Sequence, residues 1–120
     1  MKRIFISGPM SGIENYNVKE FSKAANALRD AGYFVINPAE TFKRMDGFLG
    51  DRKEIEANFN EFPRGRLADA VIEIELALLR SCDEIYLLNG WEESRGARRE
   101  LQEALEHGLI VKQEMKNNEK

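Results

Sequence analysis

Cysteine, histidine and long apolar runs are scarce in this sequence, and each shortage narrows its possible functions. The only cysteine, Cys82, cannot form an internal disulfide or a thiolate metal cluster. Because it lies between Leu79 and Ile85, we interpret it as a small buried hydrophobe rather than a nucleophile. The only histidine, His107, precedes Gly108, a pattern typical of a helix C-terminus. The sequence therefore predicts no metal site and no cofactor.

A membrane-spanning run and a surplus of basic residues are also missing. No apolar stretch is long enough to cross a bilayer, and the apolar part of residues 1–7 is too short for a signal peptide. We therefore expect a cytoplasmic protein that does not bind membranes. The net charge of −3 argues against a protein that binds nucleic-acid polymers, but it does not exclude a single nucleotide as ligand.

Short apolar runs alternate along the chain with longer segments that have helical periodicity. At 120 residues the chain has the length of one domain. The apolar runs predict strands over residues 2–7, 33–36, 85–88 and 109–111. Helical spacing predicts helices over about residues 15–31, 66–81 and 94–107. This order predicts the α/β class, with a small doubly wound parallel sheet of four to five strands and helices on both faces.

Two segments fall outside this regular pattern. We expect one domain over residues 1–112, with a long loop at about 39–65 and a polar tail at 113–120 that frays. A loop of that length in a compact domain is a lid, contains local helix (here over 51–58), or packs on the core. Its aromatic side chains could stack on a base or simply anchor the loop.

A glycine-rich loop, Gly8-Pro9-Met10-Ser11-Gly12, follows the first predicted strand. Such a loop often binds phosphate, because free backbone amides meet the N-terminus of the next helix. Asn15 or Asn17 is expected to cap that helix and Gly32 to end it. The spacing matches neither the dinucleotide fingerprint nor a P-loop, so a phosphate site and a plain tight turn both stay open.

The predicted helix over residues 66–81 has apolar residues on more than one side. This pattern favours packing on the sheet and also on a partner subunit. Glu75 lies within the apolar region. Burying an unpaired charge costs on the order of several kcal/mol, so Glu75 either lies at a wet edge or is held there for a purpose.

The junction between the third predicted strand and its helix, residues 89–100, is the main candidate site. In an open parallel sheet such junctions lie at the carboxyl ends of the strands, where ligands bind. Gly90 and Gly96 would permit tight backbone geometry, and Ser94 is a plausible N-cap. Glu100, one to two turns into the helix, could act as a nucleophile or base. The alternative is a solvated glutamate among charged neighbours.

Three stretches carry a resemblance to a known family: Ile4 to Gly12, Gly32 to Glu40, and Cys82 to Glu92 with Ser94, Gly96 and Glu100. The chain resembles a family of small, mostly uncharacterised phage and bacterial proteins described as a domain of unknown function, DUF4406. That family is similar to the nucleoside 2-deoxyribosyltransferases and the 2′-deoxynucleoside 5′-phosphate N-hydrolases.

The resemblance implies a flavodoxin-like fold and cleavage of the N-glycosidic bond of a small-molecule nucleoside or nucleotide. Ser94, Gly96 and Glu100 keep the Ser-x-Gly-x-x-x-Glu spacing that carries the catalytic glutamate in the hydrolases. Glu100 would attack or stabilise the anomeric carbon of deoxyribose, whose transition state resembles an oxocarbenium ion. The substrate-binding residues that the resemblance implies are Ser7, Gly8, Met10, Ser11, Gly12, Asn37, Gly90, Trp91, Ser94 and Gly96.

Two positions depart from the resembling enzymes. Phe5 stands where they usually have a tyrosine, so its hydroxyl is absent. Glu75 stands where the hydrolases have an aspartate, so the second catalytic acid is kept but is one methylene longer. Both departures bear on activity or substrate. The arginines of the junction either add positive charge at the site or form a solvated basic face; they are Arg95, Arg98 and Arg99.

Three functions stay open from the sequence. The first is an N-glycosidase or deoxyribosyltransferase with Glu100 as the catalytic carboxylate. The second is a non-catalytic protein that binds a nucleotide or a ribosylated metabolite, and the third is an interaction protein that uses its apolar helix face. We expect a homodimer or higher homo-oligomer under all three, because in the resembling enzymes a neighbouring subunit helps to complete the site.

Overall fold

The computed structural model describes residues 1–10, 13–40 and 66–115. Within these ranges the strands are β1 (Arg3–Ser7), β2 (Phe34–Ile36), β3 (Glu84–Leu87) and β4 (Ile110–Gln113). The α-helices are α1 (Val18–Asp30), α4 (Arg66–Arg80) and α5 (Arg95–Glu106), and the 3-10 helices are η1 (Glu14–Asn17) and η2 (Trp91–Glu93). Of the predicted loop at 39–65, residues 39 and 40 are described and are helical, whereas residues 41–65, with the predicted short helix at 51–58, lie outside the described residues, as do Ser11 and Gly12.

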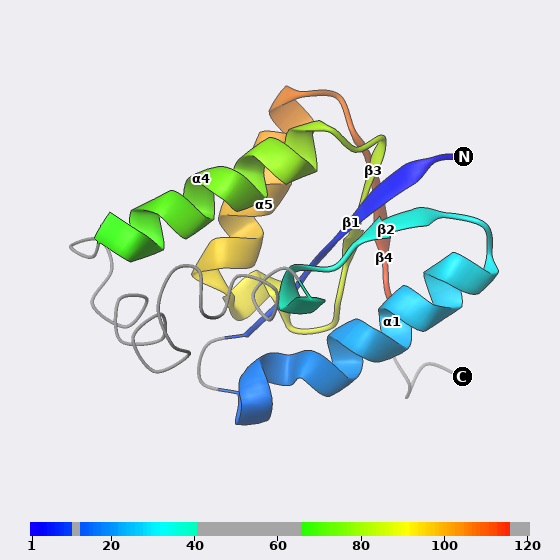
Figure 1. The fold of residues 1–120 in the computed structure, drawn as a ribbon, viewed down its shortest axis with the longest axis horizontal. Helices are drawn as coiled ribbons and strands as arrows, with labels where there is room; N and C mark the ends of the chain where they lie inside the picture. The colour runs from blue at the N-terminus through cyan, green and yellow to red at the C-terminus, as the bar shows by residue number, and fades with distance from the viewer. Residues whose placement is uncertain (11–12, 41–65, 116–120) are drawn as a thin grey trace.

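The described strands form one sheet in the order β2-β1-β3-β4, and every neighbouring pair is parallel. The chain passes from β1 to β2 on one side and then crosses back to β3 on the other. Figure 1 shows α1 on one face of the sheet and α4 and α5 on the opposite face. These features confirm the predicted doubly wound α/β sheet, with four strands in the flavodoxin-like order.

Two apolar clusters, one on each face of the sheet, form the core. Alternation along β1 divides its side chains between the faces, because successive residues of a strand point in opposite directions. Ile4 and Ile6 pack with α1, whereas Phe5 packs with α4 and α5; all three are fully buried. Cys82 belongs to the second cluster, and burial raises the pKa of its thiol, which agrees with its interpretation as a small hydrophobe.

The start of α1 differs from the expectation that an asparagine side chain caps it. Asn17 occupies the N-cap position with a left-handed φ of 62°, but its side chain makes no capping hydrogen bond. Instead its Nδ2 donates to the carbonyl oxygen of Pro9 at 3.0 Å. The asparagine therefore holds the glycine-rich loop rather than the helix end. Gly32, with φ of 96°, follows the last turn of α1 as predicted.

The last strand is longer than its apolar residues indicate. β4 continues to Gln113, and the backbone N–H of Glu114 donates to the carbonyl oxygen of Leu87 at 2.8 Å. The Glu114 carboxylate also accepts from the backbone N–H of Asn89 at 3.0 Å. Residues 113–115 are thus held along β3 rather than frayed, because main-chain hydrogen bonds at a sheet edge need no apolar side chain. Residues 116–120 lie outside the described residues.

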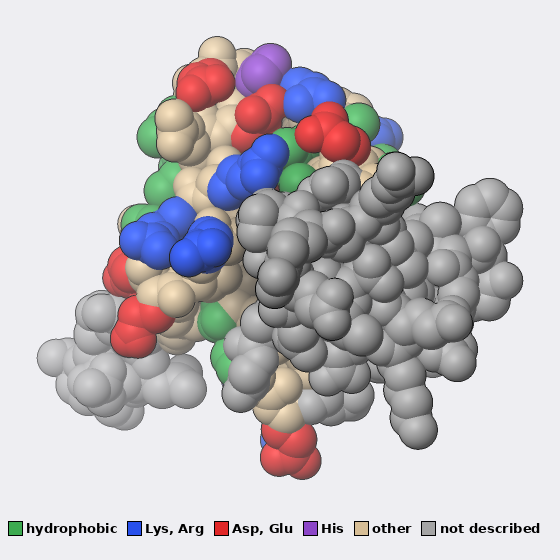
Figure 2. All heavy atoms as spheres, turned by 90° about the vertical axis from the view of Figure 1, so that its left-hand side faces the viewer, with side chains coloured by type: hydrophobic (Ala, Val, Ile, Leu, Met, Phe, Trp, Pro, Cys, Tyr) green, Lys and Arg blue, Asp and Glu red, His purple; other side chains and the backbone are tan. Residues whose placement is uncertain are grey.

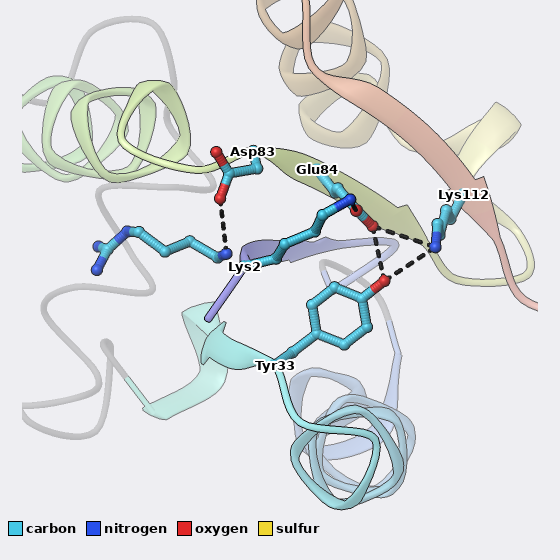
Figure 3. A network of polar contacts seen from close by, with 6 residues as sticks. Lys2, Tyr33, Asp83, Glu84 and Lys112 are labelled. Carbon is cyan, nitrogen blue, oxygen red and sulfur yellow. Dashed lines mark hydrogen bonds and ion pairs between the residues drawn. The ribbon is translucent and has the colours of Figure 1, made fainter.

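A polar network around the first residue of β3 connects residues that lie in or directly before the described strands (Figure 3). Its centre is Glu84, whose side chain is 1% exposed. Tyr33 donates its hydroxyl hydrogen to Oε1 of Glu84 at 2.9 Å, and the Lys112 ammonium donates to the Tyr33 hydroxyl at 2.9 Å. Ammonium nitrogens of Lys112 and Lys2 also lie 3.4 Å from the carboxylate. The buried charge is therefore balanced by two nearby ammonium groups and by one hydroxyl donor to Oε1, while Oε2 receives no hydrogen bond from the described residues.

No helix within the described ranges has the length and the apolarity that crossing a bilayer requires.

Candidate active site

The candidate site lies at the carboxyl ends of β1 and β3, where the winding of the sheet changes direction. Ser7 is the last residue of β1 and is paired with Leu87 at the end of β3. The loops that follow these two strands touch, since a Cβ added to Gly90 would lie 3.3 Å from Cγ of Pro9. The two motifs that the sequence separates by about eighty residues are therefore neighbours at this edge. Such switch points are the usual ligand sites of open parallel sheets.

The junction between β3 and α5 forms as the sequence predicts at Gly90 and Ser94, but not at Gly96. Gly90 has a φ of 90°, which only glycine adopts without strain, and η2 follows it directly. Ser94 caps α5, because its Oγ accepts from the backbone N–H of Ala97 at 3.1 Å. Gly96 lies within α5, and an added Cβ would meet the Ser94 hydroxyl oxygen at 4.0 Å, an ordinary contact distance. The backbone therefore does not require glycine at position 96.

Glu100 points from α5 toward β1. Its Oε1 accepts a hydrogen bond of 2.5 Å from the hydroxyl of Ser7. The Ser7 side chain is 1% exposed, and Glu100 is only partly exposed. Glu103, one turn further along α5, instead forms an ion pair of 2.7 Å with Arg80. Glu100 is therefore not a solvated helix glutamate but part of a contact between the helix and the end of the first strand.

Glu75, on α4, adds a second carboxyl to this contact. It is 8% exposed, and its Oε1 receives no hydrogen bond from the described residues. Burial raises its pKa well above the usual range, and the charge of Glu100 and a hydrogen bond between the two carboxyls raise it further. Of the two placements left open for Glu75, a wet edge or a held position, the structure gives the held one.

The pKa of Glu100 is raised to about 7. Burial is the largest cause, and the hydrogen bonds from Ser7 and Glu75 act in the opposite direction. Two contacting carboxyls share protons, so they titrate as a pair. Near neutral pH this pair can both hold and release a proton, which is what acid–base or nucleophilic chemistry by carboxyl groups requires.

The other expected substrate-binding residues lie at the same edge of the sheet, but several have structural roles. Gly8 is buried, and an added Cβ would lie 2.7 Å from Cβ of Leu88, so close packing explains this glycine. Met10 packs against the α1 cluster and Trp91 against the α4–α5 cluster. Asn37, after β2, is buried, and its Oδ1 accepts from the backbone N–H of Ala39 at 3.0 Å.

Basic side chains lie at the surface on the side of the molecule toward which β1 runs (Figure 2). The three arginines of α5 that the sequence singles out are all exposed; they are Arg95, Arg98 and Arg99. They match the interpretation of a solvated basic face. In the part of the chain that the structure describes, no group of three or more histidine, cysteine, aspartate or glutamate side chains could hold a metal ion.

The hydrogen bond from Ser7 to Glu100 is the feature that the sequence did not predict. The sequence predicts Ser7 as a residue that lines the ligand, not as a partner of the catalytic candidate. One signal was present: Ser7 lies two residues after Phe5 and so shares the face of β1 that packs on α4 and α5. That face places its hydroxyl toward the helices that carry Glu75 and Glu100.

The sequence matches a protein family over most of its length. The family described as a domain of unknown function, DUF4406, matches residues 2–113. The chain belongs to the DUF4406 family. In this DUF4406 protein the match includes the end of β1, the β3–α5 junction and both acids of the site.

A solved structure has a similar fold. It belongs to a 2-deoxyribosyltransferase from the psychrotolerant bacterium Bacillus psychrosaccharolyticus, with 22% sequence identity and a TM-score of 0.64. The alignment covers 96% of the DUF4406 protein and 77% of the transferase chain. At this identity the likeness shows the fold. No curated protein matches the chain.

Proposed function

We propose that this protein cleaves the N-glycosidic bond of a deoxynucleoside or nucleotide, or transfers its deoxyribosyl group, with Glu100 as the catalytic carboxylate. The observation that supports this proposal most strongly is the contact of Glu100 with Ser7 and Glu75 at the switch point of the sheet. The fold that the chain shares with a 2-deoxyribosyltransferase supports the substrate class. A small-molecule nucleoside or nucleotide is the proposed partner.

The chemistry follows from the two carboxyls. An oxygen of ionised Glu100 forms a bond to the anomeric carbon as the bond from that carbon to the base nitrogen breaks. The base leaves with the electron pair and takes a proton, which neutral Glu75 can supply. In hydrolysis, water then attacks the anomeric carbon, its proton passes to Glu75, and Glu100 leaves as a carboxylate. In transfer, the nitrogen of a second base replaces water.

Release of free base across a panel of deoxynucleosides and their 5′-monophosphates tests the proposal. We expect Glu100→Gln to lower the rate by on the order of 10³-fold, because an amide neither attacks carbon nor stabilises a cation as a carboxylate does. Glu106→Gln, at the exposed end of the same helix, is the matched control and should keep the wild-type rate. Release by Glu100→Gln at the wild-type rate would end the assignment.

Binding without cleavage is the second candidate, and the fully buried Phe5 ring favours it. The aromatic side chain at this position of β1 has no hydroxyl and belongs to the core. A binding protein would show thermal stabilisation by a nucleotide that is recovered intact. At a ligand concentration of 100 times Kd the free energy of unfolding should rise by about 2.7 kcal/mol.

A homo-oligomer in the cytoplasm is part of the proposal. Ile74 on α4 is 39% exposed and Leu105 on α5 is 60% exposed, so apolar surface remains on the two helices next to the site. A second copy of the chain is the proposed partner of that surface. The molecular mass in solution, measured by light scattering, tests it; a monomer at micromolar concentration would contradict this part alone.

A further inference from the structure

The hydroxyl of Ser7 is already committed to a partner in the absence of any ligand. Its Oγ donates to Oε1 of Glu100 at 2.5 Å, and the Ser7 side chain is 1% exposed. A short hydrogen bond to a carboxylate is among the stronger kinds that proteins form. A hydroxyl that is buried and bound in this way is not offered to a substrate. The function of the Ser7 hydroxyl therefore lies in its effect on the charge of Glu100.

Within the described part of the chain, the second carboxyl of the pair has no comparable donor. Oε1 of Glu75 is buried and receives no hydrogen bond from the described residues, and the neighbouring acid is Glu100 itself. Two contacting carboxyls, one buried and the other only partly exposed, cannot both be ionised at low cost, so near neutral pH the pair holds one proton. Among the described residues, Glu100 has a hydroxyl donor and Oε1 of Glu75 has none, which makes the pair asymmetric.

We propose that Ser7 is a positioning residue that selects Glu100 as the ionised member of the pair and leaves the proton on Glu75. A hydroxyl donor stabilises a carboxylate more than it stabilises a neutral carboxyl group. Neutral Glu75 then acts as a second donor to Glu100. The catalytic meaning of this division rests on the proposed function, whereas the division of charge does not.

The surrounding groups agree with this assignment. The hydrogen bonds from Ser7 and Glu75 hold the pKa of Glu100 near 7, below the value that burial alone would give. Glu75, on α4, is the titratable group that faces Glu100 from another described element. On α5 itself the next acid, Glu103, is paired with Arg80 at 2.7 Å, so its charge is compensated.

A titration of the glutamate side-chain carboxyl carbons by NMR tests the proposal without any substrate. The protein is labelled with ¹³C at glutamate Cδ, and the resonance lost in Glu100→Gln identifies Glu100. Its midpoint in the wild-type protein should lie near pH 7. In Ser7→Ala the midpoint should move upward by about one pH unit, which is the size of one hydrogen bond to a charged group.

Ser81→Ala is the matched control, because it also removes one serine hydroxyl that makes hydrogen bonds, but near the amino ends of the strands. It should leave the Glu100 midpoint unchanged. If Ser7→Ala does not fold, Ser7→Cys keeps a similar side-chain volume with a weaker donor, and its Glu100 midpoint should lie above the wild-type midpoint by less than one pH unit. A midpoint that stays in place in a folded Ser7 variant would overturn the proposal.

Kinetics separate this proposal from the proposed function. If the protein releases base, the acidic limb of the pH profile of kcat/KM should move upward in Ser7→Ala by the same amount as the NMR midpoint. If the Ser7 hydroxyl contacted substrate, its removal would instead raise KM and leave the acidic limb of the pH profile in place. That result would contradict the positioning role. An upward NMR midpoint without base release by the wild-type protein would sustain the role of Ser7 and end the proposed reaction.

Discussion

Two acidic sites, near opposite ends of the parallel strands, shift the pKa of a glutamate side chain in opposite directions. Near the amino ends, Glu84 accepts from Tyr33 and lies close to the ammonium groups of Lys2 and Lys112 (Figure 3). Burial by itself would raise the pKa of Glu84, but these partners together lower it below the usual value. Near the carboxyl ends, Glu100 has a hydroxyl and a second acid as its described partners, and its pKa rises to about 7.

This difference in pKa distinguishes a structural acid, Glu84, from an acid that can exchange a proton near neutral pH, Glu100. A compensated carboxylate such as Glu84 stays ionised and joins strands. The pair of Glu75 and Glu100 has no cation beside it among the described residues. Such a pair reduces the free energy of unfolding, because burial disfavours charge that no cation balances. Proteins commonly accept such a cost at sites of chemistry. Burial of an acid therefore indicates function only when its partners are considered as well.

The largest expected effect is on reaction rate. We predict that Glu75→Gln lowers base release by about 100-fold, because an amide cannot supply a proton to the departing base. Glu84→Gln should leave the rate per folded molecule within about twofold of wild type, because Glu84 lies away from the reacting end. Initial rates, corrected for the folded fraction by circular dichroism, measure both. Equal losses in the two variants would remove the distinction between the sites.

The next effect is on stability and concerns the amino end. Glu84→Gln should lower the free energy of unfolding at pH 7.5 by about 2 kcal/mol, because it removes a carboxylate that is bound by one hydroxyl and two ammonium groups. The folded pKa of Glu84 is depressed, so its stabilisation is present above the unfolded pKa of about 4.3 and is lost as pH falls through the folded value. Urea unfolding at pH 7.5 and pH 4 should therefore give a smaller difference at pH 4.

At the carboxyl end the sign should reverse. The folded pKa of Glu100 is raised to about 7, so the native state binds more protons than the unfolded state between about pH 4.5 and 7. The wild-type protein should lose stability as pH rises through this window. Glu100→Gln removes that loss and should be more stable than wild type by about 1–2 kcal/mol at pH 8, with little difference at pH 5. Destabilisation of this variant at pH 8 would contradict an uncompensated site.

The smallest expected effect sharpens the description of the Glu84 network. Tyr33→Phe removes the hydroxyl that donates to Glu84 and accepts from Lys112, but it keeps the ring. We expect a loss of about 1 kcal/mol, less than for Glu84→Gln, because both ammonium groups stay close to the carboxylate. Thermal unfolding compares the two variants with Tyr86→Phe, which removes a hydroxyl from a partly buried tyrosine of β3. A loss in Tyr33→Phe that exceeds that of Glu84→Gln would make the tyrosine the centre of the network.

Local patterns predicted most of the fold. Apolar runs located the four described strands, and the helical spacing together with Ser94, Gly32 and Gly108 located helix ends to within a few residues. These features depend on interactions between residues that are close in sequence, so periodicity and capping chemistry report them directly. The end of β4 was less predictable, because the hydrogen bonds along β3 leave no mark on the side chains.

Contacts between distant elements were the part that the sequence could not supply. Glu100 was singled out by its place after the third strand, but its bond to Ser7 joins residues 93 positions apart and depends on β1 lying next to β3. The pairing of Glu84 with Tyr33 and Lys112 likewise depends on the register of neighbouring strands. Strand order and register are set by the whole sheet, so no single segment encodes them.

The attachment of Glu114 has a practical consequence for shortening this chain. The backbone N–H of Glu114 donates to the carbonyl oxygen of Leu87 at the end of β3. Its carboxylate accepts from the backbone N–H of Asn89 in the turn that follows. A stop codon placed directly after the last residue of β4 would remove both hydrogen bonds of Glu114 while it keeps every predicted strand and helix. A minimal expressed version should therefore end no earlier than Met115, whose carbonyl oxygen also receives the Asn89 amide at 3.5 Å.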